Sequence, residues 1–294
     1  MEPTYYAAID IGSNAVRLQV KRLEDAREGR FSRVVMMRVP LRLGQESFTA
    51  GRISEKKSHD LKELMRAYAI VMGLYDIKPD CFRGCATAAM REASNGHKVL
   101  ENIERLTGVR VEIITGQEEA QIVCSTHCDV DKDLMYVDVG GGSTEVSIIS
   151  GGELVSSKSY PLGSVRVLTG SVDRGVVDTL VHDMKIAAIE HPGLTVVGAG
   201  GNINKLYEIA EDRDASGRTL SLQSLRAMFY ELSSLTLEKR AAKFNLKPDR
   251  ADVIVPAAEI FITIAEAVGA SFIEVPSVCL SDGIIEHLYK TKNS

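Results

Sequence analysis

The spacing of apolar residues along the chain predicts alternating strands and helices, and therefore an α/β fold. Alternating or continuous apolar residues indicate three strands at 5–10, 16–23 and 31–43, which form a hairpin meander. After residue 54 the apolar residues recur at helical spacing, so an amphipathic helix at 54–74 is expected to lie on this sheet. The first half is completed by a strand at 81–86, a turn into a helix at 87–95, a helix at 98–107 and a strand at 109–114.

The second half also mixes strands and helices. The expected elements are a hairpin at 134–160, a helix at 176–188, a strand and turn at 194–203 that open another helix, helices at 221–242 and 256–269, and a closing helix at 282–289. Thr115 and Glu118 form the T-x-x-E pattern of a capping box, so a helix should begin there and join the two halves. We predict an N-terminal domain at 1–118, a C-terminal domain at 119–281, and a terminal helix at 282–294 that packs back on the first domain.

Composition narrows the class of protein. The 294 residues are 45% hydrophobic and 26% charged, as in an ordinary soluble globular protein of two domains. A net charge of −5 argues against a broad electropositive face, so no nucleic-acid partner is expected. The most apolar late stretch, 251–270, is interrupted by Pro256, Glu259 and Glu266 and predicts no membrane span. Because Met1-Glu2-Pro3 begins no basic or apolar signal segment, we expect a cytoplasmic protein.

Two short motifs carry the same pattern of an apolar strand, an aspartate and a glycine turn. The first contains Asp10 and the second contains Asp138. Glycine lets the backbone approach a ligand closely, so that consecutive N–H groups can converge on an anion. The second motif contains three successive glycines, Gly140, Gly141 and Gly142, which cost backbone entropy that a plain hairpin would avoid. The alternative is a pair of structural turns, but we predict phosphate binding by Gly12, Ser13, Asn14, Gly140, Gly141, Gly142, Ser143 and Thr144.

Acidic residues lie beside both glycine turns. Asp138 and Glu145 are seven residues apart across the second turn, a spacing that can bring both carboxylates to the mouth of one loop. Two acids beside a phosphate would repel it unless a cation lies between them, and their oxygen ligands suit Mg²⁺ or another divalent ion. We predict that Asp138, Glu145 and Asp10 bind this metal. The alternative is a capping aspartate and a solvated strand glutamate.

Further residues are candidates for contacts with the same ligand. Three arginines, Arg17, Arg91 and Arg166, lie next to turns that carry glycine or hydroxyl residues. The alternative is that each is an ordinary surface arginine whose aliphatic stem packs on apolar groups. Arg91 follows a strand-turn signal, which favours a phosphate clamp. We also expect a third loop to close the site or to contact the distal part of the ligand, through Gly200, Gly201 and Asn202.

Six motifs, taken in order, resemble those of the exopolyphosphatase / guanosine pentaphosphate phosphohydrolase (Ppx/GppA) family. They are Ala8-Ile-Asp10-Ile-Gly12-Ser13-Asn14, Ala86-Thr87-Ala-Ala-Met-Arg91-Glu92-Ala, Gly116-Gln-Glu118-Glu119-Ala120, Val137-Asp138-Val-Gly-Gly-Gly-Ser-Thr-Glu145, Leu162-Gly163-Ser164-Val165-Arg166 and Arg250-Ala-Asp252-Val-Ile. The resemblance extends from about Tyr6 to Leu288.

The resemblance implies two ribonuclease-H-like α/β domains of the actin/sugar-kinase/Hsp70 (ASKHA) architecture around a central cleft. It also implies Mg²⁺-dependent hydrolysis of a terminal phosphoanhydride. Glu119 falls on the family's catalytic glutamate, Asp138 and Glu145 on its metal-associated acids, and the glycine turns on its phosphate loops. Arg17 and Arg91 fall where arginines are expected to meet phosphates.

This sequence departs from the family pattern at two places. Family members commonly show a Gly-x-Gly/Ser-Gly-Thr turn in the third loop, whereas this chain has Asn202 after Gly201. The chain also stops at Ser294, without the helical extension that many relatives carry, which we interpret as the short two-domain form.

We expect an enzyme that releases inorganic phosphate from the end of inorganic polyphosphate, with Glu119 activating water. Guanosine pentaphosphate (pppGpp) presents the same terminal anhydride, so a phosphohydrolase that acts on it is the first alternative. A non-catalytic sensor of (p)ppGpp or polyphosphate is disfavoured, because a pure binder has no use for acids beside a polyanion. A sugar kinase of the same architecture is a third alternative. The family resemblance also favours a homodimer.

Overall fold

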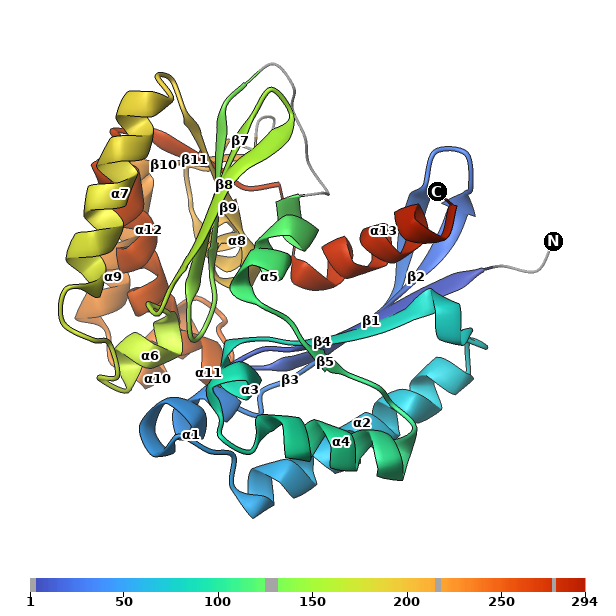
Figure 1. The fold of residues 1–294 in the computed structure, drawn as a ribbon. Helices are drawn as coiled ribbons and strands as arrows, with labels where there is room; N and C mark the ends of the chain where they lie inside the picture. Colours follow the sequence, from blue (N-terminus) through green and yellow to red (C-terminus); the bar gives the residue numbers. More distant parts are fainter. Residues whose placement is uncertain (1–3, 125–131, 215–217, 277–278, 294) are drawn as a thin grey trace. The chain divides into compact units, whose positions relative to one another are not determined.

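The computed structural model describes residues 4–124, 132–214, 218–276 and 279–293. The chain divides into two compact units, each with its own sheet and apolar core. Unit 1 contains Met1–Thr126 and Leu280–Ser294, and unit 2 contains His127–Cys279. We describe each unit by itself (Figure 1).

Unit 1 contains a five-stranded sheet in the order β3-β2-β1-β4-β5. Strands β1, β2 and β3 form an antiparallel meander, whereas β4 and β5 run parallel to β1. The strands are β1 Tyr5–Ile11, β2 Val16–Asp25, β3 Arg30–Val39, β4 Phe82–Ala86 and β5 Glu112–Ile113. The helices are α1 Leu43–Ala50, α2 Glu55–Gly73, the short 3₁₀ turn η1 Pro79–Cys81, α3 Ala88–Glu92, α4 Gly96–Thr107, α5 Gly116–Cys124 and α13 Leu280–Asn293.

The two faces of this sheet are covered by different helices. Helices α2 and α4 lie side by side on one face, and α13 lies on the other, against β1, β2 and α5 (Figure 1). Because side chains alternate along a strand, Ala7, Ile9 and Ile11 of β1 enter the core beneath α2 and α4. Asp10 therefore points to the other face, which α5 and α13 share.

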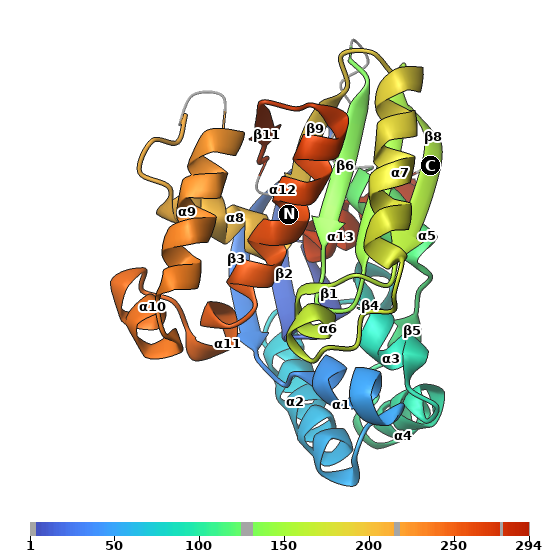
Figure 2. The same ribbon diagram turned by 90° about the vertical axis from the view of Figure 1, so that its left-hand side faces the viewer.

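Unit 2 contains a six-stranded sheet in the order β10-β11-β9-β6-β7-β8. Helix α12 is the most buried helix of its core and packs beside α7 and α9 (Figure 2). The strands are β6 Leu134–Val139, β7 Thr144–Ser150, β8 Glu153–Tyr160, β9 Thr195–Ala199, β10 Thr219–Ser221 and β11 Phe272–Glu274. The helices are α6 Ser164–Leu168, α7 Val176–Glu190, α8 Gly200–Ile209, α9 Leu222–Ser234, α10 Leu237–Lys243, α11 Pro248–Ala251 and α12 Ile254–Val268.

The structure corrects two of the predicted elements. The strand predicted at 31–43 ends at Val39, because Arg42 adopts a left-handed backbone conformation, with φ of 54°, and starts helix α1. The helix predicted at 221–242 is two helices, because Leu235 is extended and the Thr236 side chain accepts a hydrogen bond from Lys239 N to cap α10. Within the described ranges, every helix is too short or too polar to cross a lipid bilayer.

A buried polar cluster fixes the start of α13 to the sheet of unit 1. Gln19 Nε2 donates to Asp282 Oδ1 over 2.8 Å, and Lys21 Nζ lies 2.7 Å from the same oxygen. Gln19 is fully buried and its Oε1 accepts a hydrogen bond of 2.5 Å from Ser281 Oγ.

Replacing Asp282 by alanine should leave Gln19 and Lys21 without this acceptor. Removing one partner of a buried polar pair costs about 1–3 kcal/mol, so Asp282→Ala should lower the free energy of unfolding by about that amount. Denaturant unfolding followed by circular dichroism would measure it. The control is Asp60→Ala on α2, because Asp60 is partly exposed and its partner, Lys56, is exposed. Equal stability of both variants would contradict the role given to the cluster.

Candidate active site

The first glycine turn, residues 12–15, lies at the carboxyl end of β1. Gly12 N donates to Ala15 O, which closes the turn. The carbonyl oxygens of Ser13 and Asn14 accept hydrogen bonds from Gly44 N over 2.8 Å and Arg42 N over 3.0 Å. The start of α1 therefore holds the carbonyl side of this turn, while Ser13 N donates to no other group in the described part of the chain.

Gly44 makes this support possible and was not identified from the sequence. A Cβ atom at position 44 would lie 2.9 Å from Ser13 Cβ and 3.2 Å from Ser13 O. Its signal in the sequence was weak, because Gly44 lies 31 residues after Ser13 and directly follows the segment predicted as a strand.

Asp10 and Arg17 form an ion pair directly behind the first turn. The two residues face each other across β1 and β2, and Arg17 Nη1 lies 2.5 Å from Asp10 Oδ2. The Asp10 residue is only 2% exposed. Asp10, which was predicted to bind the metal, and Arg17, which was predicted to contact phosphate, therefore pair with each other in this structure.

The carboxyl ends of β4 and β5 bring Arg91 and the start of α5 to the same edge of the sheet. Thr87 N donates to Ile11 O at the end of β1, which places α3 beside the first turn. Arg91 Nη1 donates to Ile114 O over 2.8 Å, one residue before the cap of α5. In parallel sheets, ligands bind at the carboxyl ends of the strands, so this edge is the natural binding edge of unit 1.

The predicted capping box at Thr115 is confirmed. Glu118 N donates to Thr115 Oγ1 over 3.1 Å, and Thr115 N donates to Glu118 Oε2 over 2.9 Å. These hydrogen bonds from Thr115, the backbone bond first, hold the pKa of Glu118 below its usual value. Glu118 is therefore committed to the helix start, as the sequence predicted.

Glu119 lies on the next position of α5 and is half-buried, with its Oε2 atom shielded from solvent. Burial raises the pKa of the neighbouring Cys85 thiol to about 12. The positive charge of Arg83 opposes this shift, and the negative charges of Glu112, Asp10 and Glu119 add to it. Cys85 also pairs with Asp10 across β4 and β1. Glu119 and Asp10 thus influence the same buried position of unit 1.

The second glycine turn, between β6 and β7, is built in the same way. Gly140 N donates to Ser143 O, and the carbonyls of Gly140 and Gly141 accept from Ser164 N and Val165 N at the start of α6. In addition, Arg166 Nε donates to Gly142 O over 2.8 Å. The N–H groups of Gly141 and Gly142 donate to nothing else in the described part of the chain, so they are available to an anion.

Gly163 allows the start of α6 to approach this turn. A Cβ atom at position 163 would lie 2.5 Å from Gly141 O and 2.5 Å from the carbonyl carbon of Gly142. Real Cβ contacts with backbone atoms are never that short, so glycine is required here. The sequence placed Gly163 and Arg166 in a family motif but gave neither residue this role.

Asp138 and Glu145 face each other directly across β6 and β7. Glu145 is 3% exposed, and its Oε1 accepts hydrogen bonds from Ser143 Oγ over 2.6 Å and Ser159 Oγ over 2.9 Å. In unit 1 the corresponding positions hold an aspartate opposite an arginine. Unit 2 therefore carries two acids where unit 1 carries a neutral pair.

Other hydroxyl groups of the second turn also have partners inside the protein. Thr144 is fully buried, and its Oγ1 donates to Leu162 O over 2.5 Å. Since the Ser143 hydroxyl donates to Glu145, a phosphate contact at either residue would depend on its backbone N–H or on an exchange of hydrogen bonds.

The third loop begins helix α8 close to Asp138. Gly200 has φ of 88°, and a Cβ atom there would lie 2.3 Å from Asp138 Oδ1. The positive end of the α8 dipole therefore stabilises the Asp138 carboxylate. Asn202 Nδ2 donates to Val139 O over 3.2 Å, and Arg250 Nη1 donates to Gly201 O. Asn202 thus connects this loop to the end of β6, which the sequence did not predict.

The residues of unit 2 suit a magnesium ion. Among the described residues, no three His, Cys, Asp or Glu side chains converge into a complete metal site. Mg²⁺ in phosphate-transfer enzymes is commonly bound by one or two carboxylates together with water and substrate phosphate oxygens. The Asp138–Glu145 pair matches that requirement, whereas Asp10 is already neutralised by Arg17.

Comparisons with known proteins agree with the fold and with these motifs. The family model described as the Ppx/GppA phosphatase family matches residues 23–292. Two solved structures share the fold: an exopolyphosphatase from Cytophaga hutchinsonii, with a TM-score of 0.85, 19% identity and 98% of each chain covered, and the Aquifex aeolicus Ppx/GppA family member, with a TM-score of 0.78, 24% identity and 99% of each chain covered.

Curated relatives have two different names. Exopolyphosphatase 1 of Mycobacterium tuberculosis is 25% identical over 304 residues, which cover 94% of this chain and 86% of the relative. A guanosine-5'-triphosphate,3'-diphosphate pyrophosphatase of Aeromonas hydrophila is 29% identical over 301 residues, which cover 95% of this chain but only 58% of that protein.

The fold and these loops define an α/β protein of the ASKHA architecture, as the sequence predicted. More specifically, the chain belongs to the Ppx/GppA phosphatase family. It is by class a phosphoanhydride hydrolase.

Proposed function

We propose that this protein is a Mg²⁺-dependent exopolyphosphatase that releases inorganic phosphate from the end of inorganic polyphosphate. The second glycine turn is the main support for the proposal. It offers the N–H groups of Gly141 and Gly142 beside the paired acids Asp138 and Glu145. Unpaired N–H donors beside two carboxylates suit a phosphate group bound together with a divalent cation.

In the proposed reaction, water attacks the terminal phosphorus in line with the leaving oxygen. Glu119 orients this water and takes its proton, a role that contributes about 10²–10⁴-fold in comparable enzymes. The N–H groups of the glycine turns and the Arg17 and Arg91 side chains stabilise negative charge on phosphate oxygens. Magnesium held by Asp138 and Glu145 would supply further positive charge to these oxygens.

The substrate is the finer part of the proposal. Relatives named exopolyphosphatase and relatives named for guanosine-5'-triphosphate,3'-diphosphate both cover most of this chain, but the latter are much longer proteins. Phosphate release from long-chain polyphosphate, pppGpp and ATP at equal concentrations of terminal phosphate would test the assignment. We expect polyphosphate to give the highest kcat/KM. A higher value for pppGpp would instead support the pppGpp phosphohydrolase.

The same assay addresses a non-catalytic sensor. A sensor would bind polyphosphate or (p)ppGpp and release no phosphate in the presence of Mg²⁺. The homodimer and the cytoplasmic location stay predictions.

The paired acids predict a specific metal dependence. Glu145→Gln removes one of two opposed carboxylate charges, so the Mg²⁺ concentration for half-maximal phosphate release should rise at least about tenfold. Asp183→Asn is the matched control, because Asp183 is a unit 2 carboxylate that pairs with Lys158 over 2.6 Å. If Glu145→Gln needs the same Mg²⁺ concentration for half-maximal phosphate release as the parent protein, this carboxylate does not bind the metal.

A further inference from the structure

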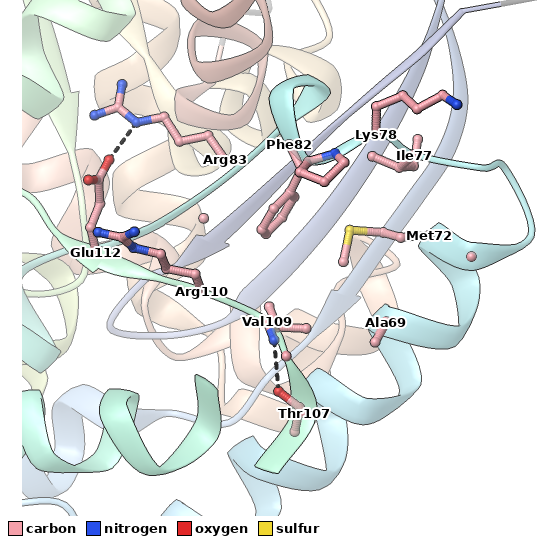
Figure 3. Close-up of a pocket in the computed structure, with 14 residues that line it drawn as sticks. Ala69, Met72, Ile77, Lys78, Phe82, Arg83, Thr107, Val109, Arg110 and Glu112 are labelled. Atoms are coloured by element: carbon pink, nitrogen blue, oxygen red, sulfur yellow. Dashed lines mark hydrogen bonds and ion pairs between the residues drawn. The ribbon is translucent and has the colours of Figure 1, made fainter. Parts of the chain in front are cut away.

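A pocket lies in unit 1, away from the glycine turn of that unit. Its volume is about 700 Å³, within the range of small-molecule sites. The lining comes from the end of α2, the start of β4 and the segment that connects α4 to β5 (Figure 3). Phe82 is the first residue of β4, whereas the first glycine turn and Thr87 follow the opposite ends of β1 and β4. The pocket is therefore separate from the edge that carries Arg91 and Glu119.

Several apolar side chains lie in the interior of the pocket. Met72 and Val109 are buried, and Phe82 is half-buried with its ring directed into the opening between them (Figure 3). Gly73, at the end of α2, borders the opening, and no atom lies within 4 Å of a Cβ placed there. This arrangement suits a flat ring, which can pack on the Phe82 ring and on the aliphatic side chains.

The rim of the pocket is positively charged. Lys78 and Arg110 are exposed on opposite sides of the opening (Figure 3). In residues 4–124, 132–214, 218–276 and 279–293, neither side chain forms a hydrogen bond or an ion pair. By contrast, Arg83 is paired with Glu112 over 2.5 Å. The rim thus offers two cations with unused charge and one fixed carboxylate.

We propose that this pocket binds a nucleoside monophosphate. The base packs on Phe82 between Met72 and Val109, and the phosphate binds the Arg110 guanidinium, whose planar donors match phosphate oxygens. Glu112, held in place by Arg83, accepts hydrogen bonds from the sugar hydroxyls. Recognition uses both parts of the ligand, because the base packs on the apolar side chains and the phosphate pairs with the cations of the rim.

Strands β4 and β5 connect the pocket to the edge of the sheet that carries Arg91 and Glu119. β4 begins at Phe82 in the pocket and ends at Ala86, directly before Thr87 and α3. The other lining segment leads through Glu112 and Ile114 to the cap of α5. A ligand that binds at the starts of both strands therefore contacts the two strands that lead into α3, which carries Arg91, and α5, which carries Glu119.

Isothermal titration calorimetry with AMP, adenosine and ribose 5-phosphate would test the proposal. AMP should bind, and adenosine and ribose 5-phosphate should each bind at least about tenfold more weakly, because each lacks one of the two recognised parts. Arg110→Ala should weaken AMP binding by at least about tenfold. The matched control is Arg105→Ala, since Arg105 on α4 is exposed and does not line the pocket.

Gly73→Phe provides a second, independent variant. It fills the opening from the last residue of α2, where the backbone is helical and the space is open, so thermal melting should show a folded protein that no longer binds AMP. If Arg110→Ala and Gly73→Phe both bind AMP with the affinity of the parent protein, the nucleotide binds elsewhere and the proposal is wrong. Failure of AMP to bind the parent protein at millimolar concentration would overturn it as well.

Discussion

Glu119→Gln should release phosphate from polyphosphate at least about 100-fold more slowly than the parent protein. The amide keeps the size and shape of the side chain but cannot accept a proton from the attacking water. Substrate affinity and thermal stability should change little, because Glu119 is not part of the helix cap. Single-turnover phosphate release would measure the chemical step separately from binding.

The adjacent glutamate supplies a close control. Glu118 is on the same helix, one residue away, and its carboxylate accepts hydrogen bonds from Thr115. Glu118→Gln should therefore lower stability slightly, since the cap is weakened, while the rate of phosphate release stays near that of the parent. If the two variants lost activity equally, the separate roles given to Glu118 and Glu119 would be wrong.

Gly163→Ala should lower the rate of phosphate release by about 100-fold. The added methyl group would lie 2.5 Å from backbone atoms of Gly141 and Gly142, so the second turn or the start of α6 has to move. A displacement of about 1 Å in a positioning element can cost about 10²-fold in rate. Overpacking at this position should also lower the free energy of unfolding by about 1–3 kcal/mol.

Val155→Ile is a suitable control for the added carbon atom. Val155 lies on β8 of the same unit and is 53% exposed, so an extra methylene there meets solvent. This control should keep both stability and activity. Full activity of Gly163→Ala would show that the second turn can shift without consequence and would contradict its proposed use in binding phosphate.

The two hairpins could be predicted from the sequence because a tight turn fixes the register of its strands. Once the turn after Asp138 was assigned, Glu145 had to lie close to it, and the structure pairs these two residues directly. The same reasoning applies to Asp10 and Arg17, which are also seven residues apart. The capping box at Thr115 was predictable for a similar reason, since it depends only on residues within one helical turn.

Contacts between distant segments were not predictable in this way. Gly44 and Gly163 each bring a helix start against a glycine turn, and a short sequence pattern gives no sign of which turn a distant glycine will approach. Helix α1 was missed because Leu41 and Leu43 continue the alternation of the preceding strand, although Arg42 between them has a left-handed backbone conformation. The hydrogen bond from Asn202 to Val139 likewise depends on the parallel pairing of β6 and β9.

The comparison of the two hairpins also refines the metal prediction. The sequence predicted all three of Asp10, Asp138 and Glu145 as metal ligands, and the family resemblance implied this role for Asp138 and Glu145. The structure distinguishes them, because Arg17 neutralises Asp10, whereas Glu145 adds a second negative charge opposite Asp138. We therefore expect the cation to bind in unit 2.

A crystal structure of Glu119→Gln with tripolyphosphate and Mg²⁺ would show whether the second glycine turn binds phosphate beside a magnesium ion. We predict phosphate oxygens within hydrogen-bonding distance of Gly141 N and Gly142 N, and a magnesium ion bound by Asp138 and Glu145. Tripolyphosphate bound with both glycine N–H groups facing solvent, or a metal held by other residues, would contradict the account.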